Sequence, residues 1–104
     1  MEKFDITTLD QLNEIDKNSI NTSQLIYKHS TTCTLSEGVW NDLKKSDLKI
    51  NYLDLLAYRN ISNEIESRYN VRHESPQVLI IKNGKCTYHE SHWRIEVERI
   101  KKEL

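Results

Sequence analysis

The fold of this chain is decided by residues 25–43, LIYKHSTTCTLSEGVWNDL. The stretch opens with the short apolar run Leu25-Ile26-Tyr27, which predicts a buried strand. Small hydroxylated residues follow and indicate a loop. Apolar residues then recur every four positions, as on one face of a helix, at Leu35, Val39 and Leu43. Cys33 is therefore expected between the end of a strand and the first turn of a helix.

This position favours a reactive thiol at Cys33. The first N–H groups of a helix have no partners within it, and the helix dipole favours negative charge there. A free thiol with a pKa of about 8.5 is only about 3% ionised at pH 7, whereas at a helix N-terminus the pKa can fall to roughly 3.5–7.5. The alternative is a buried structural cysteine. Thr34 and Glu37 match a capping box, which predicts that the helix begins at Thr34 or slightly earlier.

Length and charge restrict the function classes. The chain of 104 residues predicts a single domain over residues 1–104. With 15 basic and 16 acidic residues the net charge is −1, so there is no electrostatic footprint for nucleic acid. The N-terminus lacks the apolar run of a signal peptide, and no segment approaches about 18 consecutive apolar residues. We therefore expect a cytoplasmic monomer without nucleic-acid or membrane partners, in which a persistent thiol is either buried or catalytic.

Periodicity and turn residues predict eight elements along the chain. In order they are a helix over 7–17, a strand over 24–28, a helix from about 34 to 44–45, a strand over 48–54, a helix over 61–69, strands over 78–81 and 85–89, and a last helix after residue 91. A β-α-β crossover gives a parallel pair, and Asn83-Gly84 predicts a hairpin. The order α-β-α-β-α-β-β-α therefore predicts an α/β domain with a mixed four-stranded sheet flanked by helices.

Polar residues mark the expected helix ends. A Thr8-x-x-Gln11 box, or Thr7, can cap the first helix, Asn60 the third and Ser91 the last. Asn70 fits the left-handed position that ends the third helix. The last helix has an apolar stripe that is expected in the core, made of Trp93, Val97, Ile100 and Leu104.

The arrangement resembles the thioredoxin fold, because a β-α-β unit has Cys33 at its first strand–helix turn and Pro76 opens a later hairpin. In that fold the proline is cis and faces the cysteine. The resemblance therefore implies a cis bond before Pro76 and pairing of the Ser75 backbone with an extended substrate segment. From the sequence alone a trans proline that opens a strand is the alternative, since only about 5–6% of X–Pro bonds in folded proteins are cis.

Three segments together resemble the monothiol bacilliredoxins, the YtxJ-like family of the bacillithiol system in the thioredoxin-like superfamily. These are Thr32–Ser36, His73–Val78 and Ser91–Ile95, and the similarity extends from Thr8 to Leu104. The His-Glu-Ser-Pro-Gln segment is the most specific of them. One departure is Thr34, where the family usually has proline, and Thr34 keeps an N–H that could donate to a sulfur anion.

This resemblance implies an enzyme in which the Cys33 thiolate attacks the mixed disulfide between a client protein and bacillithiol. Bacillithiol then stays on Cys33 until a second thiol, expected to be another bacillithiol, releases it. Bacillithiol is thus a co-substrate, and no bound cofactor is expected. Position 36 is serine, so a monothiol route is expected. The open alternatives are a thioredoxin-fold binding module without catalysis and a general reductase for glutathione-type disulfides.

We assign eight residues to the site. Cys33 is catalytic, and the residues expected to bind substrate are Thr32, Thr34, Ser36, Ser75, Pro76, His73 and His92. Either histidine would lower the pKa of Cys33 if protonated beside it, and a surface or capping role is the alternative. The candidates to meet the acidic malate part of bacillithiol are Arg72, Lys28 and Lys82.

The spacing Cys86-x-x-His89-x-x-His92 has residue types that bind metals. Cys86 and His89 are three apart on a strand and are expected on opposite faces, and a fourth ligand is missing. We therefore expect no metal site and interpret Cys86 as a buried, inert strand thiol.

Overall fold

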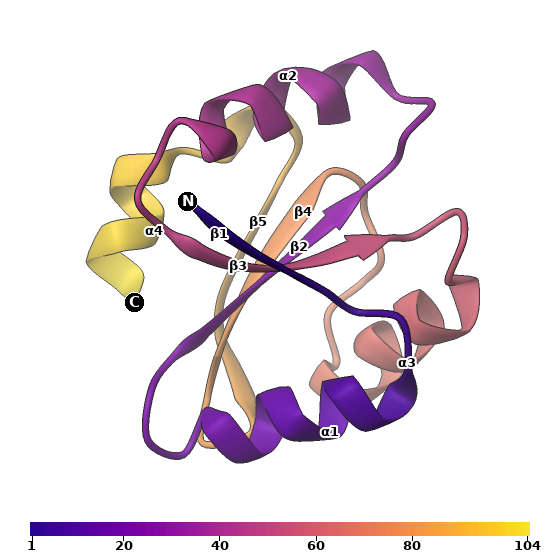
Figure 1. Cartoon of the computed structure of the whole chain (residues 1–104), viewed down its shortest axis with the longest axis vertical. Coiled ribbons are helices and arrows are strands. Elements are labelled where there is room, and N and C mark those ends of the chain that lie inside the picture. The colour runs from indigo at the N-terminus through magenta and orange to yellow at the C-terminus, as the bar shows by residue number, and fades with distance from the viewer.

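The computed structural model describes residues 1–104 and shows a central sheet with helices on both faces (Figure 1). The strands are β1 (Glu2–Asp5), β2 (Gln24–His29), β3 (Lys49–Asp54), β4 (Gln77–Lys82) and β5 (Lys85–Ser91). The helices are α1 (Leu9–Asn18), α2 (Thr34–Lys44), α3 (Arg59–Tyr69), the 3-10 helix η1 (His92–Arg94) and α4 (Val97–Glu103). None of these helices combines the length and the apolar character needed to cross a bilayer.

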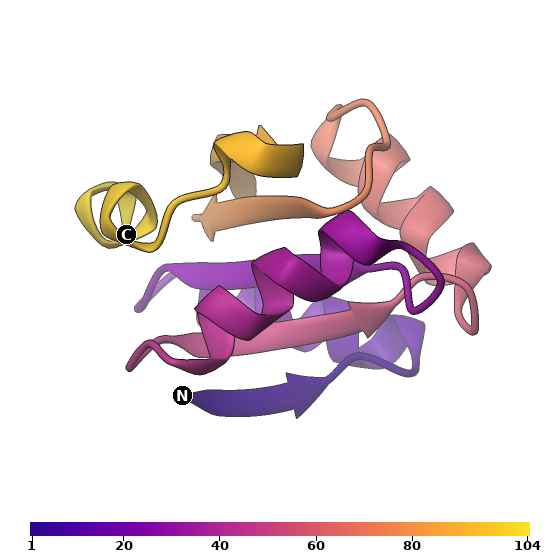
Figure 2. The same ribbon diagram turned by 90° about the horizontal axis from the view of Figure 1, so that it is seen from above.

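The sheet has the strand order β1-β3-β2-β4-β5, and Figure 2 shows its strands one above another. β2 is parallel to β3, as a β-α-β crossover requires, and antiparallel to β4. β4 returns antiparallel as β5 through the turn at Asn83-Gly84. The predicted α/β fold with a mixed sheet between helices is confirmed.

The strand count corrects the prediction, because the sheet has five strands and the additional one is β1. All four residues of β1 are exposed, so no apolar alternation marks it in the sequence. Backbone pairing holds it instead: the Glu2 N–H donates to the Leu48 C=O at 3.0 Å, and the Ile6 N–H donates to the Tyr52 C=O at 2.8 Å. The chain order therefore begins with an edge strand that runs parallel to β3.

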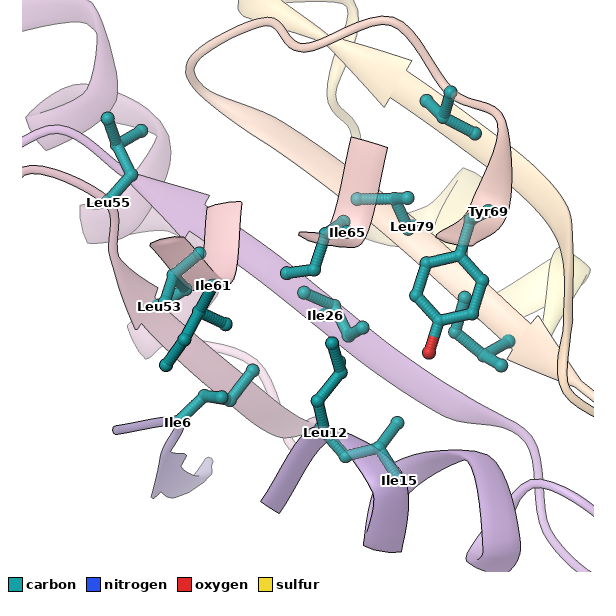
Figure 3. Packing of buried hydrophobic residues seen from close by; sticks show 12 residues of the cluster. Ile6, Leu12, Ile15, Ile26, Leu53, Leu55, Ile61, Ile65, Tyr69 and Leu79 are labelled. Carbon is teal, nitrogen blue, oxygen red and sulfur yellow. The ribbon is translucent and has the colours of Figure 1, made fainter. Parts of the chain in front are cut away.

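Alternate residues of β2 face two separate hydrophobic clusters. Ile26 belongs to the cluster under α1 and α3, which Figure 3 shows from close by. Leu25 and Tyr27 belong to the cluster on the other face, with Trp40 of α2 and Ile100 of α4. Figure 2 accordingly shows α2 in front of the sheet and α1 and α3 behind it. The last residues of β2 continue this alternation into the loop that carries Cys33.

Of the predicted ends of the first and third helices, two are confirmed and one is wrong. The Gln11 N–H donates to Thr8 Oγ1 at 3.2 Å within the expected capping box. Asn70 has φ 54 and ends α3 as expected. Asn60, however, is already inside α3, because the C=O of Tyr58 accepts the first bonds of that helix and Tyr58 is its N-cap.

The predicted last helix is divided into η1 and α4. Ser91 precedes η1 without a side-chain cap, and His92 has the left-handed φ of 59. The extended residues Ile95 and Glu96 interrupt the helix between η1 and α4. The His92 N–H donates to the Pro76 C=O at 2.9 Å. Trp93 is consequently 72% exposed, so the prediction that it lies in the core is wrong. Ile100 is the buried member of the expected stripe.

Candidate active site at the start of helix α2

Cys33 stands where the strand β2 gives way to the helix α2, as the sequence predicts. It is the N-cap of α2 with extended backbone (φ −104, ψ 118), and its C=O accepts a hydrogen bond from the Glu37 N–H at 3.1 Å. Its own N–H donates to the Ser30 C=O at 3.1 Å and closes the preceding loop. The predicted capping box is wrong, because Thr34 is already helical and Cys33 takes the cap position without a side-chain hydrogen bond.

Hydrogen bonds from the first turn of α2 lower the pKa of the Cys33 thiol. The Ser36 backbone N–H contributes most and the Ser36 hydroxyl next, burial opposes them, and the Leu35 backbone N–H adds to the lowering. Hydrogen bonds to the charged form of a group favour that form. Cys33 is also free and only half-buried, so the charged form of the sulfur is favoured where a substrate can reach it. The Thr34 N–H is not among the donors that produce this shift.

Ser36 connects this thiol to the turn before β4. It is fully buried, and its Oγ lies 3.4 Å from the Ser30 nitrogen and 3.4 Å from Ser75 Oγ. The Ser75–Pro76 peptide bond is cis, as the resemblance to the thioredoxin fold implied. The structure therefore brings Cys33, Ser36, Ser75 and Pro76 to one place.

An aromatic group behind the first turn of α2 was not assigned to the site from the sequence. The Tyr27 O–H donates to the Ser36 C=O at 2.9 Å, and its ring stacks on Trp40 with centroids 5.6 Å apart. His29 is 2% exposed, with Nδ1 3.2 Å from the Tyr27 oxygen and Nε2 3.4 Å from Glu37 Oε2. Burial raises the pKa of Tyr27 and lowers the pKa of His29. Both are therefore neutral at pH 7 and support the turn that carries the sulfur's donors.

A signal for these two residues was present in the sequence. Tyr27 and His29 are two apart on a strand, so both side chains point to the face that α2 covers. The backbone donor at Leu35 had no such signal, because an N–H group is the same in every residue type except proline.

Lys28 points to the opposite face of β2 from Tyr27 and His29. There it contacts residues in and next to the turn that precedes β4. Its side chain is 0% exposed, with Nζ 2.6 Å from His73 Nδ1 and 3.3 Å from Gln77 Oε1. Burial lowers the pKa of Lys28 to about 8, against the carboxylates of Glu66 and Glu74. A fully buried ammonium does not meet a ligand in solvent, so Lys28 is removed from the candidates for the malate of bacillithiol.

The two predicted histidines lie beside the turn but do not contribute to the lowered pKa of Cys33. His73 faces Lys28, and burial followed by the charge of Lys28 lowers the pKa of His73. His92 Nδ1 lies 3.8 Å from Glu74 Oε2. Their positions leave them as neighbours of the turn rather than activators of the sulfur.

The remaining predicted residues are at the surface. Thr32 and Thr34 flank Cys33 and are exposed, and Thr32 Oγ1 lies 3.4 Å from the hydroxyl of Ser30. Arg72 is exposed on the turn before Pro76, whereas Lys82 ends β4 at the opposite end from that turn. The threonines therefore border the sulfur, and Lys82 is away from it.

Cys86 is the second free cysteine and lies on β5. It packs against the cluster under α1 and α3, its Sγ–H donates to the Tyr88 C=O at 3.3 Å, and burial raises its pKa. A bulge between β4 and β5 shifts the register, so that Cys86 pairs with Ile81 and His89 with Leu79. Both therefore point to the same face, and the expectation of opposite faces is wrong. No three His, Cys, Asp or Glu side chains gather in a metal-binding group.

Comparisons with known proteins agree with this geometry. A protein-family model described as "Monothiol bacilliredoxin BrxC" matches residues 4–100. A solved structure described as "A putative oxidoreductase with a thioredoxin fold" is 27% identical, with a TM-score of 0.87 over 97% of this chain and 92% of that one. A thioredoxin of Malassezia sympodialis is 16% identical, with a TM-score of 0.74 over 98% and 86% of the two chains. Mitochondrial thioredoxin 3 of Saccharomyces cerevisiae is 17% identical, with a TM-score of 0.71 over 95% and 90%.

Proposed function

Because this chain belongs to the monothiol bacilliredoxin family and is a thiol–disulfide oxidoreductase, we propose that it removes bacillithiol from the cysteines of client proteins. Cys33 is the nucleophile. The observation that carries the proposal is the set of hydrogen bonds from Ser36 and Leu35 that lowers the pKa of Cys33. The thiolate, rather than the thiol, attacks disulfides.

The proposed reaction consists of two exchanges. In the first, the Cys33 thiolate attacks the bacillithiol sulfur of the mixed disulfide. The bond between that sulfur and the client breaks, the client thiolate leaves and takes up a proton, and a disulfide between Cys33 and bacillithiol forms. In the second, the thiolate of another bacillithiol attacks the bacillithiol on Cys33, and the Cys33 thiolate leaves. Overall one disulfide is exchanged for another: the client is released as a thiol, one free bacillithiol is consumed, and it forms a disulfide with the bacillithiol that came from the client.

The chain's own residues favour an external thiol for the second exchange. Position 36 carries a serine, and Cys86 packs on the sheet face under α1 and α3 with a raised pKa. The hydrogen bonds that stabilise the attacking Cys33 thiolate also stabilise it as the leaving group, which speeds its release.

Client proteins would bind along the turn at Ser75 and Pro76. The Ser75 backbone lies beside the cis bond, and its hydroxyl reaches the Ser36 hydroxyl that supports the sulfur. The exposed side chains of Thr32 and Thr34 border the same place. We place this activity in the cytoplasm, since a reducing compartment keeps both cysteines free. We assign the activity to a monomer.

The experiment incubates the chain with bacillithiol disulfide and measures intact mass. We expect one bacillithiol adduct, which is absent in Cys33→Ser and retained in Cys86→Ser. Release of bacillithiol from a capped client protein should likewise stop in Cys33→Ser. An unchanged rate of release in Cys33→Ser would leave only a binding module, and equal rates with glutathione-capped and bacillithiol-capped clients would indicate a general reductase.

A further inference from the structure

Trp93 is the most exposed large hydrophobic side chain of the molecule, at 72%. Exposure of so large an apolar ring to water is unfavourable. A solvent-exposed aromatic side chain of this kind is typical of a binding surface. The packing of the core does not require Trp93, since Ile100 supplies the buried contact of the last helical segment.

The backbone ties His92, the neighbour of Trp93, to the turn that carries Pro76. His92 adopts φ 59, which costs conformational energy in a residue other than glycine. The left-handed turn is fixed by the His92 N–H, which donates to the C=O of Pro76 at 2.9 Å. It directs η1 toward α2, and η1 and α2 lie against each other. Figure 2 shows η1 above the middle of α2.

Trp93 contacts the side chains of both its chain neighbours. Its ring lies against the His92 ring with centroids 6.0 Å apart and an interplanar angle of 25°. The Arg94 guanidinium carbon lies over the Trp93 ring, 5.7 Å from its centroid. The three side chains therefore form one group in which a largely exposed apolar ring lies next to a cation.

These side chains line a hollow of about 490 Å³ that carries both signs of charge. Glu74 and Glu90 supply carboxylates, and Arg94 supplies a guanidinium that carries no salt bridge to either of them. A guanidinium without a partner suits a carboxylate, which it can bind through two parallel hydrogen bonds. The volume suits a small ligand rather than a folded domain.

We propose that the surface of His92, Trp93 and Arg94 binds the part of a low-molecular-weight thiol that does not react, with its ring on Trp93 and its carboxylate on Arg94. The inference rests on the proposed function and names bacillithiol, whose malate is acidic, as the matching thiol. Glu74 and Glu90 are placed to meet an amine of the same molecule. The small thiol is then held while its sulfur reacts at Cys33.

The test compares two small disulfides in the Cys86→Ser background. One is bacillithiol disulfide, and the other is 2-hydroxyethyl disulfide, which has neither ring nor carboxylate. Trp93→Ala and Arg94→Gln should each slow the reaction of Cys33 with bacillithiol disulfide by about three- to tenfold, in line with one aromatic or charged contact. Neither should change the rate with 2-hydroxyethyl disulfide. The matched controls are Phe4→Ala, an exposed aromatic on the opposite edge strand, and Arg99→Gln, whose guanidinium lies 5.6 Å from the Tyr88 ring.

A binding measurement separates this surface from catalysis. In Cys33→Ser, reduced bacillithiol should change the fluorescence of Trp93, and Trp93→Phe should remove that change while leaving the signal of the buried Trp40. If the wild type itself reacts equally with both disulfides, the proposed function fails and this inference fails with it. If the wild type prefers bacillithiol disulfide and both variants keep the preference, the inference alone is overturned. Equal slowing with both disulfides, or slowing only with client proteins, would also overturn it.

Discussion

Two cysteines of this chain are free and half-buried, and their environments shift their pKa values in opposite directions. At Cys33 the hydrogen bonds from Ser36 and Leu35 outweigh burial and lower the pKa. At Cys86 burial outweighs hydrogen bonds from the backbone of Tyr88 and Ile80 and raises the pKa. The extent of burial alone therefore does not distinguish the thiol whose pKa is lowered from the thiol whose pKa is raised.

The difference comes from the secondary structure around each sulfur. A helix begins with N–H groups that have no partner inside it, and Cys33 stands directly before such a turn. Cys86 lies instead on the edge strand β5, which pairs with β4, and its side chain packs against the cluster under α1 and α3. Free donors at the helix start therefore lower the pKa of Cys33, whereas burial raises the pKa of Cys86.

The alkylation rates of the two cysteines should show the largest effect. At pH 7 we expect Cys33 in Cys86→Ser to react with iodoacetamide much faster than Cys86 in Cys33→Ser, because the pKa of Cys33 is lowered, the pKa of Cys86 is raised, and the thiolate is the form that reacts. Intact mass against time measures both rates. The pH profile is the second readout: the rate of Cys33 should level off at a lower pH than that of Cys86. Rates within threefold of each other would contradict the comparison.

Lys28 extends the comparison to a fully buried side chain whose pKa is lowered by burial. Its pKa of about 8 in the folded chain is below its ordinary value, so the unfolded chain binds more protons between about pH 8 and about pH 10.4. Stability should therefore rise with pH in that window, by roughly 2–3 kcal/mol. Below pH 8 the charged form is present in both states, and the cost of burying it is fully present.

The measurement is the free energy of unfolding in urea at pH 7 and pH 9.5 for the wild type and Lys28→Met. Methionine fills a similar volume without a charge, so the variant should lose this gain with pH. Staying at or below pH 9.5 avoids ionising the tyrosines of the unfolded chain. If the free energy of unfolding changes with pH in the same way in both proteins, burial does not shift the pKa of Lys28.

Ser36→Ala should produce a smaller effect at Cys33 itself. The hydroxyl is the second contributor to the lowered pKa, and its loss should raise the pKa of Cys33, because a hydrogen bond to the charged form is removed. Absorbance of the thiolate at 240 nm against pH, in the Cys86→Ser background, measures the shift. Ser30→Ala is the matched control, because the Ser30 hydroxyl contacts Thr32 rather than the sulfur. The backbone donors remain, so the pKa should still lie below that of Cys86.

Much of the site could be predicted because its signals are local. The strand–loop–helix pattern around Cys33 and the proline before β4 are both read from neighbouring residues, and the structure brings them together. The β1 strand could not be read in this way, since all four of its residues are exposed and its pairing partner β3 is distant in the chain.

The exposed position of Trp93 and the face of His89 were missed for a related reason. A left-handed backbone at His92 and a bulge in β5 each change which way the following side chains point. A prediction from periodicity assumes that the helix or strand is uninterrupted. One irregular residue therefore moves the side chains that follow it to a face other than the predicted one. Histidine carries no signal for left-handed backbone comparable to that of glycine or asparagine.

The smallest effect is expected at Thr34, which directly follows Cys33. Thr34 is the first residue of α2, a position that suits proline, and the extended backbone of Cys33 (φ −104, ψ 118) is compatible with a following proline. Thr34→Pro should therefore raise the free energy of unfolding by about 0.4–1 kcal/mol through the unfolded chain. The pKa of Cys33 should stay unchanged, because the donors to the sulfur are Ser36 and Leu35. Urea unfolding and the 240 nm titration measure the two quantities. A pKa that rises as much as in Ser36→Ala would make the Thr34 N–H a donor, and the serine and leucine contacts would then not account for the acidity that separates Cys33 from Cys86.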